Sequence, residues 1–134
     1  MKSMSFFPLF CAMTILSASA ALSEGTDIGA ALFADNCATC HGADAKGGGD
    51  MADVLTIKAT NLTLLAKGND GEFPMLKVIQ SIDGRTGTRA HGGPMPIWGS
   101  VFSNQGAALG YGSETEARGR MLSLALYLES IQAQ

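Results

Sequence analysis

The clearest chemical pattern in the sequence lies near its start, where two cysteines and a histidine stand close together. Cys37 and Cys40 are three positions apart, and His41 follows directly. Thiols and imidazoles bind metals, form disulfides and attach cofactors, so this spacing is compatible with four kinds of site. These are a structural disulfide, a redox-active dithiol, a zinc site and the covalent attachment of a c-type haem.

Three of these four sites have little support elsewhere in the sequence. A disulfide between Cys37 and Cys40 closes a very small loop and therefore constrains the unfolded chain little. No alternation of strands and helices, as around a thioredoxin-like dithiol, flanks the pair. A zinc site needs a second pair of Cys or His residues, and the only other histidine is His91. Haem attachment uses every residue of the motif, and we favour it over the other three.

The spacing of the motif also suits haem chemistry. Residues three apart share one face of a helical turn, so both thiols can reach the two vinyl groups on one side of a porphyrin and form thioethers. His41 then sits beneath the ring centre, where its imidazole can bind the iron. We therefore predict one covalent haem c held by Cys37, Cys40 and His41. We expect the haem-free chain to fold poorly, because the porphyrin supplies a large apolar surface.

A haem held by one histidine has a second axial position to fill. Four methionines lie beyond residue 20: Met51, Met75, Met95 and Met121. Only Met95 lies between two prolines, Pro94 and Pro96, which remove two backbone donors and exclude a helix there. Such a rigid extended segment can hold a thioether against iron, so Met95 is the predicted ligand. The alternative is a methionine in an ordinary surface loop, and Met121 is most simply a core residue.

The first 20 residues have the pattern of a signal peptide. Lys2 gives a positive start, residues 4–16 are apolar, and residues 17–20 are small. The apolar run of about 13 residues is shorter than the roughly 20 that a membrane-spanning helix needs. We expect cleavage after Ala20, which leaves an exported domain over residues 21–134 with no stable membrane insertion.

Composition limits the class of protein further. The chain has 134 residues, a formal net charge of −3 and 46% hydrophobic residues. This length allows one domain, and the apolar fraction is too high for a disordered chain. No cluster of Lys and Arg is present, so we do not expect nucleic acid as a partner.

Apolar periodicity predicts helices and no convincing strand, so we expect an all-α fold. Thr26 is placed to cap a helix that runs to about Asn36. A short helix is predicted from Asn61 through Lys67, ended by Gly68. Another is predicted to open with Pro74 at its first position and to close at residues 83–84. Residues 113–116, Ser-Glu-Thr-Glu, read as a capping box for a C-terminal helix. One face of that helix carries Met121, Leu124, Ala125 and Leu128.

Several motifs together resemble class I cytochrome c, and more narrowly the small monohaem c domains of bacterial respiratory chains. They are the CxxCH motif of residues 37–41, the IDGR run of residues 82–85, the AHG run of residues 90–92 and the MPIWG run of residues 95–99. The resemblance covers about residues 26–132. The GDM run of residues 49–51 departs from it, because relatives often have proline after that glycine; we expect this to affect loop shape and not ligation.

The resemblance implies three to five helices wrapped around one covalently bound haem. In such a fold the N-terminal helix crosses the C-terminal helix, which implies that Gly29 and Phe33 meet Leu124 and Tyr127. It also implies that Met95 is the axial ligand opposite His41. A bacterial, periplasmic location follows from the same resemblance together with the signal pattern.

Other polar and aromatic residues have both a functional and a plain interpretation. Arg85 is a candidate to pair with a haem propionate, or is simply solvated. Trp98 is a candidate to pack at the haem edge, or belongs to the core. His91 is more simply a propionate partner or a surface residue than a rival iron ligand. Lysines that could surround the haem edge and steer a partner, or merely keep the surface soluble, are Lys46, Lys58, Lys67 and Lys77.

A haem ligated by His and Met has no open position for a substrate, which favours electron transfer over catalysis. We therefore predict a periplasmic electron carrier that is not itself an enzyme, with other redox proteins as donor and acceptor. One alternative is a dedicated cytochrome subunit of a periplasmic dehydrogenase or a respiratory oxidase. A less favoured one is a five-coordinate haem protein that binds gases.

Overall fold

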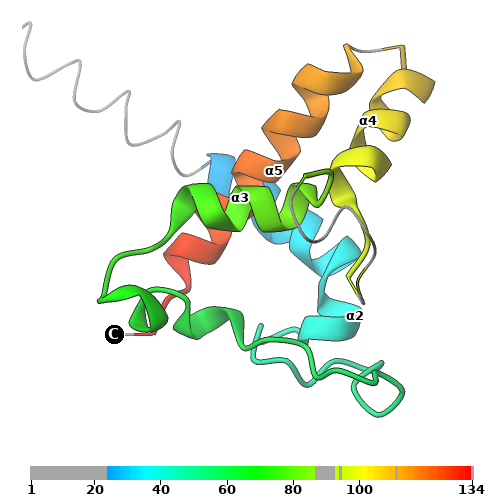
Figure 1. The fold of residues 1–134 in the computed structure, drawn as a ribbon. Coiled ribbons are helices and arrows are strands. Elements are labelled where there is room, and N and C mark those ends of the chain that lie inside the picture. Colours follow the sequence, from blue (N-terminus) through cyan, green and yellow to red (C-terminus); the bar gives the residue numbers. More distant parts are fainter. Residues whose placement is uncertain (1–23, 87–92, 94, 111, 134) are drawn as a thin grey trace, which may run out of the picture.

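The computed structural model describes residues 24–86, 93, 95–110 and 112–133 (Figure 1). Within these ranges the chain is helical and contains no strand, which confirms the all-α prediction. No helix in the described part is long and apolar enough to cross a membrane. The helices are residues 24–36, α2 (Ala38–His41), α3 (Met75–Asp83), α4 (Trp98–Ala108) and α5 (Ser113–Ser130), with two short 3-10 helices, η1 (Leu62–Leu64) and η2 (Lys67–Asn69).

The hydrophobic core is built around α5, which packs against both α3 and α4. The largest side chains with almost no exposure are Phe102 from α4 and Met121 and Leu124 from α5. Val78 and Ile82 of α3 are also buried. Met121 is therefore a core residue and has no part in the site described below.

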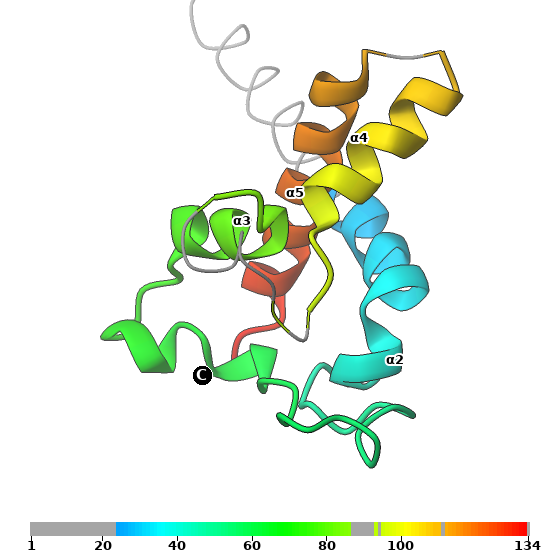
Figure 2. The same ribbon diagram turned by 45° about the vertical axis from the view of Figure 1, so that its right-hand side comes forward.

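The helix of residues 24–36 lies against the middle of α5 (Figure 2). Gly29 is buried there, and a Cβ added to it would meet the backbone carbonyl of Ser123 and lie 2.7 Å from Tyr127 Cβ. The rings of Phe33 and Tyr127 pack at 5.4 Å between centroids. The absence of a side chain at Gly29 lets the two backbones approach closely, and the aromatic pair fills the space beside them. The predicted contact between the terminal helices is thus present.

Two predicted helix starts are wrong. Residues 24 and 25 are already helical, so Thr26 lies inside the first helix and does not cap it. This first turn lies close to α5, since a Cβ on Gly25 would lie 3.4 Å from Leu126. At α5 the cap residue is Gly112 and no side chain caps the helix, so residues 113–116 do not form a capping box. Glu116, the acidic member of that box, instead accepts a hydrogen bond from Arg120 Nε at 2.9 Å.

The middle of the chain follows the predictions more closely. The side chain of Asn61 accepts a hydrogen bond from Thr63 N at 3.0 Å and so caps η1. The predicted helix of residues 61–67 is, however, two 3-10 turns, the second of which ends at Asn69. Pro74 is the residue before α3 and not its first residue. Gly84, with φ +67°, ends α3 as predicted.

The sequence patterns gave no indication of α4. Its eleven residues include two glycines, two serines and an asparagine, all weak helix formers. The helix is stabilised by packing: Phe102 is fully buried, and the missing side chain of Gly106 allows close approach to Glu116 of α5. Tertiary contacts here override local propensity.

Candidate functional site

The single turn of α2 presents the cysteine and histidine side chains together. The N–H of Cys37 bonds Phe33 O at 2.9 Å, so α2 follows the first helix without an intervening loop. The N–H groups of Cys40 and His41 bond Cys37 O at 3.1 and 2.9 Å. Both thiols are free, and both cysteines are partly buried. The predicted one-turn arrangement of the motif is therefore present.

The imidazole of His41 is oriented by a backbone carbonyl. Its Nδ1 lies 2.9 Å from the carbonyl oxygen of Thr60. A carbonyl oxygen can only accept, so Nδ1 carries the proton and the lone pair is left on Nε2. A hydrogen bond of this kind sets the tautomer of a metal-binding histidine and raises its basicity.

The loop after α2 folds back on the motif. The N–H of Gly47 bonds His41 O at 2.6 Å, and the N–H of Met51 bonds Thr39 O at 3.0 Å. A Cβ on Gly49 would meet the carbonyl oxygens of Thr39 and Ala38, so this glycine allows the loop to lie against α2. In the structure Gly49 serves the contact between loop and helix.

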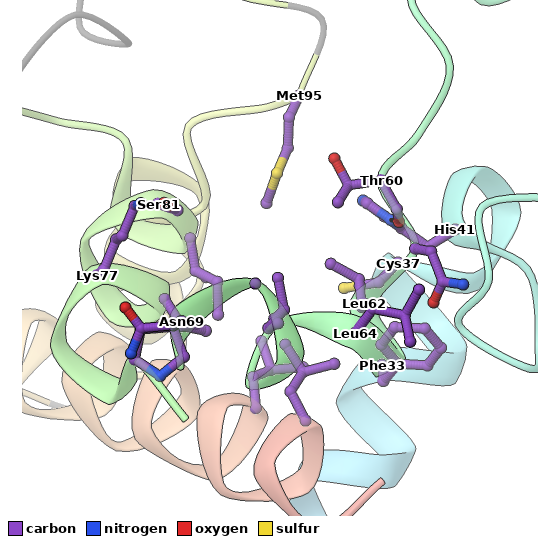
Figure 3. Close-up of a pocket in the computed structure, with 18 residues that line it drawn as sticks. Phe33, Cys37, His41, Thr60, Leu62, Leu64, Asn69, Lys77, Ser81 and Met95 are labelled. Atoms are coloured by element: carbon purple, nitrogen blue, oxygen red, sulfur yellow. Dashed lines mark hydrogen bonds between the residues drawn. The ribbon is translucent and has the colours of Figure 1, made fainter. Parts of the chain in front are cut away.

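Two adjoining cavities of about 520 and 550 Å³ lie over the motif. The first is lined mainly by apolar residues of the core, and the second by residues of the loop before η1 and of the segment that leads into α4. Both are lined by Cys37, His41, Thr60 and Met95. Cys40 lines the second cavity. Figure 3 shows Met95 entering the first cavity from above, with Cys37 and His41 on a neighbouring wall.

Comparison with protein families agrees with this geometry. Residues 26–108, more than half of the chain, match the family described as Cytochrome c. The chain belongs to the cytochrome c family. Membership implies a covalently bound haem c and transfer of electrons, so this cytochrome c is an electron carrier with redox proteins as partners. No individually curated protein and no solved structure matches the chain significantly.

The residues of this cytochrome c fit the group that its family binds. The cavities place two free thiols, one imidazole and one thioether around a space that is otherwise mostly apolar. Those are the donor types that attach a porphyrin covalently and ligate its iron from two sides. The apolar lining comes from several elements: Phe33, Leu62, Leu65, Val78, Ile82, Leu124 and Leu128.

The electrostatics of Cys37 disfavour the redox-dithiol interpretation. Burial, together with the nearby Cys40, raises the pKa of the Cys37 thiol to about 11. Reactive dithiols have a lowered pKa, because the thiolate is the nucleophile. The described residues also contain no group of three or more His, Cys, Asp or Glu side chains that could hold a metal ion, so the zinc interpretation gains no support.

Trp98 and Arg85 are placed very differently. Trp98 lines the second cavity and stacks on Phe102 with 5.4 Å between ring centroids, so it is both a site residue and part of the core. Arg85 lines neither cavity. It pairs with Asp83 at 2.6 Å and with Glu114 at 2.7 Å. The structure therefore brings Trp98, but not Arg85, together with the cysteines and His41.

Two of the four candidate lysines line the cavities and two do not. Lys77 lines the first cavity and Lys58 the second. Lys46 pairs with Asp44 at 3.8 Å, and Lys67 is exposed in η2. His91 lies outside the described residues, as do the signal-like residues 1–20.

The sequence analysis did not identify Thr60 as a site residue. It acts through its backbone carbonyl, which every residue type possesses, so no side-chain signal could have indicated it. Asn69 and Ser81, which line the first cavity near Lys77 (Figure 3), were also missed. Their positions depend on how η2 and α3 pack, which the local pattern does not specify.

Proposed function

We propose that this cytochrome c binds one haem c between His41 and Met95 and attaches it through Cys37 and Cys40. The observation that carries the proposal is the shared lining of the two cavities, because His41 and Met95, which come from segments far apart in the chain, both face the same space (Figure 3). A haem in that space would be held by the imidazole of His41 and the thioether of Met95. The bonds of α2 hold both thiols and the imidazole on one turn.

The chemistry follows from these ligand types. Haem iron, when bound, supplies a centre that gains and loses one electron. Thr60 O accepts a hydrogen bond from Nδ1 of His41, which leaves Nε2 free to bind the iron. The thioether of Met95 is a soft donor that favours the reduced iron and raises the potential above that of a bis-histidine site. With both axial positions filled by the chain, no position is open to a substrate, so the site serves electron transfer.

We further propose that the protein works in the bacterial periplasm as a carrier between redox proteins. The signal-like pattern of residues 1–20 supports export, and covalent attachment would retain the cofactor there. The rim of the second cavity offers a contact surface, since Ile57 is 63% exposed and lies beside Lys58. An apolar residue with a neighbouring positive charge suits brief docking of another redox protein near the haem edge.

Replacement of Met95 tests the ligand set. In haem-loaded Met95→Ala we expect carbon monoxide to bind the reduced protein and cyanide the oxidised protein at least about tenfold faster, because one axial position is opened. Stopped-flow absorbance measures both rates. Met51→Ala is the matched control, since Met51 is exposed and lines neither cavity.

Carbon monoxide binding by the unmodified protein is the second part of this test. If Met95 is a ligand, the unmodified reduced protein binds carbon monoxide only slowly. Rapid binding by the unmodified protein, with no change in Met95→Ala, would contradict His/Met ligation and support a five-coordinate, gas-binding haem protein instead.

A further inference from the structure

The two ends of the segment that carries Met95 are joined to each other. On one side lie Asp83, Gly84 and Arg85, at the end of α3. On the other side lie Ile97 and Gly99, at the start of α4. A Cβ on Gly84 would lie 3.4 Å from Ile97 Cα, and a Cβ on Gly99 would meet the Asp83 carboxylate. The chain therefore leaves and returns at one point, with Met95 on the segment between.

An ion pair lies across this point. Arg85 binds Asp83 with two groups, Nε at 2.6 Å to Oδ1 and Nη2 at 3.1 Å to Oδ2. Its Nη1 donates to Glu114 Oε1 at 2.7 Å, which joins the junction to the first turn of α5. Ser103 of α4 donates to the same Glu114 oxygen at 3.1 Å. One guanidinium thus connects the end of α3 to α5, and Glu114 connects both to α4.

The burial of Gly99 makes the junction tight. Gly99 is buried at the start of α4, directly beneath the Asp83 carboxylate and the Arg85 guanidinium. Any side chain at this position would separate the ion pair from α4. Charge-assisted, two-point Arg–carboxylate bonds hold a fixed geometry better than single contacts. Closing a loop at its base also reduces the number of conformations of the residues within it.

We propose that Asp83, Arg85 and Gly99 form a clamp that holds Met95 in place as a ligand. We define the clamp by these three residues, with Glu114 as its anchor on α5. The proposal rests on the proposed His/Met ligation. It assigns Asp83 and Arg85 as positioning residues that act through the base of the segment, without contact with haem. Neither residue lines either cavity.

The test uses haem-loaded Asp83→Asn, Arg85→Met and Gly99→Ala. We expect each to bind carbon monoxide and imidazole faster than the unmodified protein, on the order of tenfold, since the segment carrying Met95 is released more often. Arg85→Lys should restore part of the slow binding, because it keeps the charge but not the two-point geometry. Hydrogen exchange at the amides of Ser100 and Val101, which bond Ile97 O at 3.1 and 3.2 Å, should accelerate in the same variants.

Arg120→Met is the control for general destabilisation. Arg120 pairs with Glu116 at 2.9 Å, donates to Gln105 and lies over the Phe102 ring, and these bonds include none of the clamp residues. It should lower the melting temperature without changing ligand binding. Equal acceleration in Arg120→Met would overturn the clamp, as would an unchanged rate in Asp83→Asn. A change in Arg85→Met alone would instead indicate that Arg85 contacts a propionate. These outcomes differ from failure of His/Met ligation, in which Met95→Ala itself has no effect.

Discussion

Among single residues, Arg85 has the strongest electrostatic influence on its surroundings. Its hydrogen bonds hold the pKa of the Asp83 carboxyl below its usual value, and its bond to Glu114 lowers the pKa of that carboxyl as well. Asp83 and Arg85 are only about a quarter exposed, so solvent screens this pair less than an ordinary surface pair.

The lowered pKa of Asp83 predicts how stability depends on pH. A carboxyl whose pKa is lower in the folded state contributes its full stabilisation above the ordinary value of about 3.9 and loses it as pH falls through the folded value. We expect the melting temperature to drop below about pH 4, and Asp83→Asn to flatten part of that drop. At pH 7 the same substitution should cost about 1 kcal/mol of unfolding free energy. Thermal melts over pH 2–7 measure both effects.

Asp44→Asn is the comparison for this experiment. The side chains of Asp44 and Lys46 are about 60% exposed and lie 3.8 Å apart. Loss of this ion pair should therefore leave the fall of melting temperature below pH 4 nearly unchanged. The role of Asp83 is contradicted if the melting temperature of both variants falls with pH as steeply as that of the unmodified protein.

At the scale of elements, the contact between the first helix and α5 positions α2 and so the CxxCH motif. Gly29 permits this contact, since an added Cβ would meet the Ser123 carbonyl. We expect Gly29→Ala to lower the unfolding free energy by about 2 kcal/mol, because the helices must separate. Chemical denaturation measures the change.

Gly119 on α5 is the matched control. Nothing lies within 4 Å of a Cβ added there, so Gly119→Ala should stabilise the protein by about 0.5–1 kcal/mol through helix propensity alone. Equal effects of the two substitutions would argue against a close contact at Gly29.

The elements also show which parts of the fold a sequence pattern can predict. The CxxCH turn, the Asn61 cap, the Gly84 stop and the Gly29 contact each depend on a residue type with a specific local or steric role. Helix α4 could not be predicted, because its weak helix formers are held by packing on α5. The predicted caps of the first helix and of α5 were also wrong, because residues 24 and 25 are already helical and Gly112 precedes α5 without a side-chain cap.

Some residues of the site could be predicted from the sequence and others could not. The cysteines, His41, Met95 and Trp98 could be identified from residue type and spacing, and the structure brings them to adjoining cavities. Thr60 could not, since it acts through its backbone. The ion pair of Arg85 with Glu114 could not be predicted either. The two residues are 29 positions apart, and only the packing of α3 on α5 brings them together.

At the scale of the whole molecule, the chain encloses more space over α2 than its own side chains fill. Cavities of about 520 and 550 Å³ adjoin over α2, and the largest fully buried side chains among the described residues are Phe102, Met121 and Leu124. Protein interiors are normally close-packed, so cavities of this size belong to a fold built around a large partner group. Covalent attachment would make that group a permanent part of the core.

The most direct test of this account is the intact mass of the protein exported by bacteria that have working haem-attachment machinery. We predict the mass of residues 21–134 plus one haem, stable to denaturation, and no added mass in a Cys37→Ser/Cys40→Ser double variant. An exported chain of unmodified mass, or an added haem that persists in the double variant, would contradict attachment at these cysteines.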